Sequence, residues 1–67
     1  MKLTLNGDEY SLPDDDWTVA DLIEHLGLGG QAVAVEVNKQ LVPKRRHDET
    51  NLTDGDVVEV VTLVGGG

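Results

Sequence analysis

The chain has 67 residues, which is one domain at most, and a chain this short buries only about 60% of its unfolded surface. Its core is therefore small and leaves no room for an enclosed substrate cavity. Thirteen acidic residues against five basic ones give a net charge of −8, which argues against nucleic-acid binding because phosphate contacts need a basic face. The absence of cysteine excludes disulfides, thiolate metal sites and cysteine nucleophiles.

Residues 2–12 are predicted to form two short strands around a tight turn. Leu3 and Leu5 alternate with polar residues, and the same alternation returns after the turn. Asn6-Gly7 is the strongest short-range hairpin signal, since both residues tolerate the positive φ of a type I′ turn. Pro13 and the three aspartates at 14–16 then end strand pairing.

Residues 18–27 have the period of an amphipathic helix. Its apolar stripe consists of Val19, Leu22, Ile23 and Leu26. Thr18 is the expected N-cap, and Asp21 three residues later completes a weak variant of the capping box. Gly27 is the expected C-terminal stop. Trp17, just before the helix, is expected to support the core rather than to anchor a partner.

Three strands are predicted in the second half of the chain. They are a valine-rich strand at 32–38, a brief edge strand at 40–43 and a last strand at 57–64. One helix covers only one face of a four- or five-stranded sheet, so the arrangement is an α+β roll. If Glu59 marks the uncovered face, Val61 and Leu63 share that face, with Ala34 beside them. This parity predicts an open apolar strip, which we expect to dock partners.

Catalysis by this chain alone is not expected, and we predict no catalytic residue and no metal site. His25 and His47 are interpreted as surface histidines, because neither has a serine or acid at a diagnostic spacing. The aspartates at 14–16 are interpreted as a solvated turn. A cluster of bases (Lys39, Lys44, Arg45 and Arg46) is interpreted as ordinary solvated surface.

No apolar run approaches the roughly 20 residues of a membrane helix, and the start of the chain is no signal peptide, so we expect a cytoplasmic protein without membrane contact.

The sequence closes on Gly65-Gly66-Gly67, which we interpret as a flexible tail after a folded domain at 1–64. Three extended glycines reach roughly 10 Å and carry no side chain, so they form a thin segment with a carboxylate at its tip. A narrow channel in a partner would admit this segment, and a bulky group at Gly66 or Gly67 would block it. A linker remnant or a frayed end is the alternative.

The whole pattern resembles the ThiS-type sulfur carrier proteins of thiamine (thiazole) biosynthesis, within the ubiquitin-like β-grasp superfamily. The resemblance is carried by "VAVEVNKQLVP" at 33–43, by "LTDGDVVEVVTLVGGG" at 52–67 and by the short length. It implies a mixed sheet of four to five strands with one helix packed on one face.

The resemblance also implies a mechanism. A relative of the ubiquitin-activating enzymes would use ATP to adenylate the carboxylate of Gly67, and a persulfide from a cysteine desulfurase would then yield a thiocarboxylate. The charged carrier would deliver its sulfur to thiazole synthase. Gly66 would be the slender neighbour that the channel requires, and Gly65 would extend the reach. The chain would bind no cofactor itself, because the partner enzymes use the ATP and the persulfide.

Other functions compatible with the same pattern remain open. The small subunit of molybdopterin synthase shares the expected fold and tail, although such chains usually run longer. A carrier for another sulfur pathway is a near variant. A ubiquitin-like modifier joined to lysines, or an interaction domain with an inert tail, belongs to a different class.

Overall fold

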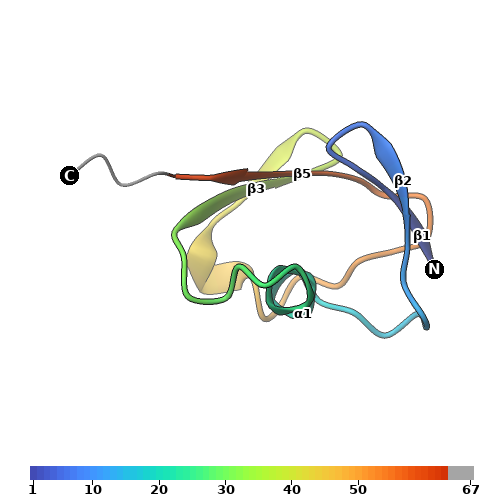
Figure 1. Ribbon diagram of the computed structural model, residues 1–67, viewed down its shortest axis with the longest axis horizontal. Helices are drawn as coiled ribbons and strands as arrows, with labels where there is room; N and C mark the ends of the chain where they lie inside the picture. Colours follow the sequence, from blue (N-terminus) through green and yellow to red (C-terminus); the bar gives the residue numbers. More distant parts are fainter. Residues whose placement is uncertain (64–67) are drawn as a thin grey trace.

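The chain forms one mixed sheet with a short helix on one of its faces (Figure 1). The computed structural model describes residues 1–63. Its elements are the strands β1 (Lys2–Leu5) and β2 (Asp8–Ser11), the helix α1 (Val19–His25), the strands β3 (Val33–Val37) and β4 (Gln40–Val42), the 3-10 helix η1 (Lys44–Arg46) and the strand β5 (Val57–Thr62). None of the described helices is long and apolar enough to cross a membrane.

The last strand in the sequence occupies the middle of the sheet. The strand order is β2-β1-β5-β3-β4, and β5 runs parallel to β1 and antiparallel to β3. The other neighbours form antiparallel hairpins. This arrangement confirms the predicted α+β fold with a five-stranded mixed sheet, and it places the predicted edge strand β4 at one edge.

Each hairpin turn contains an asparagine with positive φ whose side chain binds β5. Asn6 has a φ of 49° and Gly7 a φ of 88°, as a type I′ turn requires. The amide of Asn6 accepts a hydrogen bond from the Val60 N–H at 2.8 Å and donates one to the Val60 carbonyl at 3.1 Å. In the other hairpin, Asn38 accepts from the Val57 N–H at 2.9 Å. Both turns therefore hold the central strand in register.

The helix begins at the predicted cap. Thr18 Oγ1 accepts a hydrogen bond from the Asp21 N–H, and Asp21 Oδ2 accepts one from the Thr18 N–H, which completes the capping box. The first two N–H groups of the helix donate to the carbonyls of Thr50 and His47, each at 2.9 Å. The helix thus has partners for its N-terminal donors, which matters for a helix of only seven residues.

The core lies between the sheet and α1. Its buried members are Leu3, Leu12, Val19, Leu22, Ile23, Val35, Leu52, Val58 and Val60. The predicted helical stripe faces this core, and Trp17 packs against it in a half-buried position, as expected. Each buried valine or leucine contributes about 1.5–3 kcal/mol by leaving water.

The interpretation of His47 as a surface residue is wrong. Only 7% of its surface is exposed, and its Nε2 lies 3.0 Å from the Val42 carbonyl. Because a carbonyl oxygen only accepts, Nε2 carries the proton in this hydrogen bond. The residues on either side of His47 are polar, which indicates an exposed loop. In the structure the His47 side chain nevertheless points toward the core, directly after η1. His25 is exposed, as predicted, and its ring packs edge-on against Trp17 at a centroid distance of 5.1 Å.

Candidate functional site: the open face of the sheet

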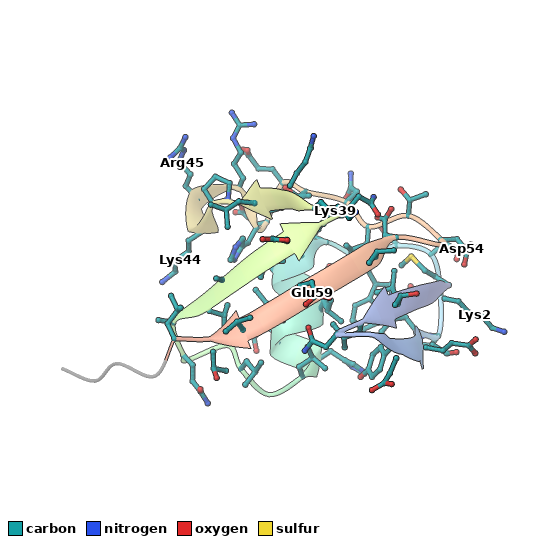
Figure 2. The ribbon with its side chains drawn as sticks, turned by 90° about the horizontal axis from the view of Figure 1, so that it is seen from above. Lys2, Lys39, Lys44, Arg45, Asp54 and Glu59 are labelled. Carbon is teal, nitrogen blue, oxygen red and sulfur yellow. The ribbon has the colours of Figure 1, made fainter. Side chains whose placement is uncertain are left out.

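The face of the sheet opposite α1 is uncovered, and β5 crosses its centre (Figure 2). Along β5, Val58 and Val60 are buried at 0% and 7% exposure. Val61 and Leu63 are 55% and 53% exposed, and Val57 is 43% exposed. From Val57 to Val61 the exposure alternates with a period of two, so the predicted parity is correct over these residues, while Thr62 at the end of the strand is exposed as well.

The neighbouring strands add apolar groups to this face. Ala34 is directly opposite Val61 in the β3–β5 register, so the two side chains lie on the same face, as predicted. Leu41 is 67% exposed and lies opposite Glu36 in the β3–β4 register. The sequence analysis missed Leu41. The signal was present in the alternation of β4, where Val42 pairs with the buried Val35 and Leu41 therefore points the other way.

Two carboxylates lie in the middle of these apolar groups. Glu36 and Glu59 are exposed and directly opposite one another in the antiparallel pair of β3 and β5. Like charges in this position destabilise a sheet, so their placement is not explained by folding. We call the set of Ala34, Glu36, Leu41, Val57, Glu59, Val61 and Leu63 the open face. It suits a partner surface that carries both apolar and basic groups.

The chain leaves the sheet at one end of the open face. The N–H of Leu63 donates to the carbonyl of Ala32 at 2.9 Å, so the chain stays beside the start of β3 up to that residue. The predicted site residues Gly65, Gly66 and Gly67 lie outside the described residues, and so does the predicted domain boundary after residue 64.

The histidines and carboxylates form no reactive group within residues 1–63. No three or more of the described His, Asp and Glu side chains are placed to hold a metal ion. His47 binds a backbone carbonyl, and His25 packs against aromatic rings.

The strand order, the single helix on one face and the central last strand define a β-grasp domain of the ubiquitin-like class. The model of the ThiS family matches residues 3–67, and the chain belongs to this family.

Three relatives illustrate the similarity. The chain is 42% identical to the sulfur carrier protein ThiS of Bacillus subtilis over 65 residues, which are 97% of this chain and 98% of that protein. It is 40% identical over its full length to a thiazole synthase of Paramagnetospirillum magneticum, of which it spans only 20%. The crystal structure of the thiamine biosynthesis protein ThiS from Geobacter metallireducens matches all of both chains with a TM-score of 0.84 at 34% identity.

Proposed function

We propose that this chain is a cytoplasmic sulfur carrier protein of thiamine biosynthesis whose terminal glycine, Gly67, carries sulfur as a thiocarboxylate. The observation that carries the proposal is the match to the ThiS family, which runs through residue 67 and so includes all three glycines. The similarity to a whole ThiS protein named as a sulfur carrier supports the same function.

The partner enzymes supply the chemistry in this proposal. A carboxylate is a poor acyl donor, so an adenylating enzyme first activates it with ATP, and a cysteine desulfurase provides the persulfide sulfur. Glycine at 65 and 66 keeps the segment thin enough for a channel. The chain itself contributes a domain that the partners recognise and a carboxylate that they modify.

Thiazole synthase is the proposed acceptor of the sulfur. Two relatives named thiazole synthase contain a segment that matches the whole of this chain over 20% of their length. A carrier-like segment and a thiazole synthase therefore occur in one polypeptide in these proteins. This supports a direct contact between the two when they are separate.

The test is the intact mass of the chain after incubation with its adenylating enzyme, a cysteine desulfurase, cysteine and ATP. We expect a gain equal to the difference between a sulfur and an oxygen atom, located on Gly67 by fragmentation. Gly66→Ala should abolish the gain because the added methyl group blocks the channel. Gly30→Ala is the matched control, since a Cβ at Gly30 meets no atom within 4 Å.

An unchanged mass with enzymes that modify a known carrier would contradict the proposal. A gain that survives Gly66→Ala would contradict the role of the thin tail and leave the carrier function in place.

The end of the open face formed by Ala34, Val61 and Leu63 is proposed as the docking surface for these partners. Val61→Asp should weaken binding to the adenylating enzyme by about tenfold, because it places a charge in a desolvated contact beside the tail. Val57→Asp is the matched control, since it is an exposed valine on the same strand and face, at the far end from Leu63. Isothermal titration calorimetry measures both. Equal losses for the two variants would show that position on this face does not matter.

A further inference from the structure

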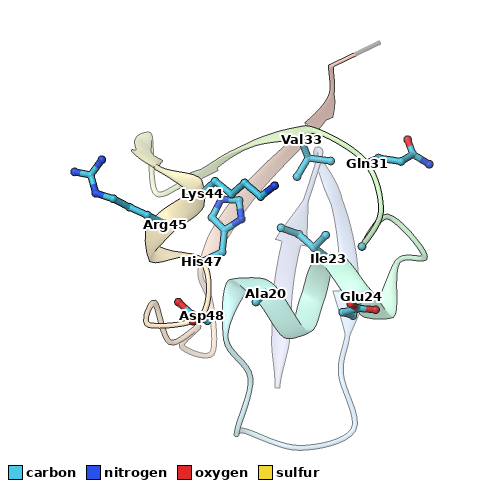
Figure 3. A pocket seen from close by; sticks show the side chains of 10 residues that line it. Ala20, Ile23, Glu24, Gln31, Val33, Lys44, Arg45, His47 and Asp48 are labelled. Carbon is cyan, nitrogen blue, oxygen red and sulfur yellow. The ribbon is translucent and has the colours of Figure 1, made fainter. Parts of the chain in front are cut away.

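A pocket of about 620 Å³ lies on the other side of the molecule, between α1, the residues before β3 and η1 (Figure 3). Its apolar lining includes Ala20, Ile23 and Val33. Lys44 of η1 and the buried His47, which directly follows η1, also line it. The size is typical of pockets that take a side chain or a small ligand. No part of the proposed sulfur chemistry uses this pocket.

The bases near the pocket have no acidic partner among residues 1–63. Within residues 1–63, the ion pairs join the Met1 amino group to Asp15 and the Lys2 side chain to Glu9. Lys44, Arg45 and Arg46 of η1, which we call the basic corner, therefore make no ion pair there. Lys39 lies apart from them, in the turn between β3 and β4. Three bases without an acidic partner therefore follow one another in η1.

The pocket is cationic at one end only. Lys44 extends over the pocket beside His47, while Glu24 lies at the opposite end of it in Figure 3. A Cβ at Gly29 would lie only 2.7 Å from the Glu24 carboxylate, which shows that this carboxylate packs against the loop after α1. Asp48 also lines the pocket, from the residues that follow η1. Arg45 lines the pocket too, so Lys44 and Arg45 outnumber Asp48 on the η1 side. An anionic group is favoured at the Lys44 end for this reason, with apolar surface next to it.

The cationic end lies close to the place where the chain leaves the sheet. Val33, which lines the pocket, is opposite Thr62 in the β3–β5 register, and Leu63 binds the Ala32 carbonyl. Figure 2 shows Lys44 toward the end of the sheet from which the chain leaves. Leu63, the last described residue, therefore lies at the same end of the sheet as Lys44, so a partner that contacts the chain at Leu63 comes within reach of Lys44.

We propose that this pocket binds an acidic segment of the thiazole synthase that receives Gly67. A carboxylate of that segment pairs with Lys44, and an apolar side chain beside it packs on Ala20, Ile23 and Val33. The inference rests on the proposed function. Together with the acidic open face, the basic corner gives the carrier two contacts of opposite charge, which fix its orientation on the partner.

The test compares Lys44→Glu with Lys2→Glu in the full chain. Both replace an exposed lysine and change the net charge equally, and Lys2 lies in β1 toward the far end of the sheet (Figure 2). Binding to purified thiazole synthase is measured by calorimetry at low and high ionic strength. We expect Lys44→Glu to raise the Kd about tenfold at low salt and Lys2→Glu to change it less than about threefold. Lys44→Arg should bind like the wild type, and the loss in Lys44→Glu should shrink at high salt.

Equal losses for Lys44→Glu and Lys2→Glu would overturn the inference, because they would report net charge rather than a site. Unchanged binding of Lys44→Glu would also overturn it. The mass experiment on the wild type distinguishes a failure of the pocket inference from a failure of the proposed function. If the chain gains sulfur and binds the synthase while Lys44→Glu binds equally well, only the pocket is refuted, whereas a chain that gains no sulfur refutes the proposed function itself.

Discussion

His47 fills space under η1 and satisfies a carbonyl of the edge strand. Its Nε2 donates to the Val42 carbonyl, and its own carbonyl accepts from the Ala20 N–H at the start of α1. One residue therefore connects β4, η1 and the helix. Because Lys44 lies three positions earlier, the buried ring also holds the element from which the basic corner projects.

Replacement of His47 by alanine should lower the free energy of unfolding by about 2–3 kcal/mol, from the lost hydrogen bond and the cavity that remains. His25→Ala is the control. It removes an exposed ring that packs against Trp17, so we expect a loss of about 1 kcal/mol or less. Urea unfolding followed by Trp17 fluorescence measures both. A smaller loss for His47→Ala than for His25→Ala would show that the buried ring is not a structural support.

At the scale of elements, β5 is the strand on which the fold depends. It pairs with β1 and β3, and both hairpin turns bind it through an asparagine side chain. The two turns thus do more than reverse the chain. They fix the register of a strand that is more than 50 residues away from Asn6, and that register decides which valines reach the open face.

Asn6 adopts the positive φ of the turn and also binds Val60 through its side chain, and Asn6→Gly removes only the second of these roles. Glycine adopts the positive φ without strain, but it removes both hydrogen bonds to Val60. We expect a loss of about 1–3 kcal/mol, because the Val60 backbone is left without these partners. Asn51→Gly is the control for the entropic cost of glycine, since Asn51 is exposed and its side chain makes no hydrogen bond within residues 1–63. Equal losses in urea unfolding would mean that the Asn6 side chain contributes nothing.

At the scale of the molecule, charge is distributed unevenly. The basic corner holds three of the five bases, so Lys2 and Lys39 are the only bases elsewhere to balance the acidic side chains. The opposed Glu36 and Glu59 add a local repulsion on the open face. The acidic side chains therefore repel one another, and a basic partner or dissolved salt weakens this repulsion.

Sodium chloride should stabilise the free protein. Raising the ionic strength from about 0.01 M to about 0.15 M shortens the screening length from roughly 30 Å to 8 Å, which weakens the repulsion among the carboxylates. We expect the urea midpoint to rise, and to rise more in Lys44→Glu, which carries a larger negative charge. A midpoint that is independent of salt in both proteins would show that repulsion does not limit stability.

Several structural features of this protein follow from short patterns in its sequence. Asn6-Gly7, the Thr18 cap and the parity of residues 57–63 act over a few positions, so the sequence by itself predicted a hairpin, a helix and the exposed faces of Val61 and Leu63. The resemblance to the ThiS family was also present in the sequence. The tertiary structure alone decided the central place of β5, the burial of His47, the opposition of Glu36 and Glu59, and the pocket beside the end of the sheet. Each of these depends on contacts between residues far apart in the chain, and such contacts form only when the helix and all five strands are packed together.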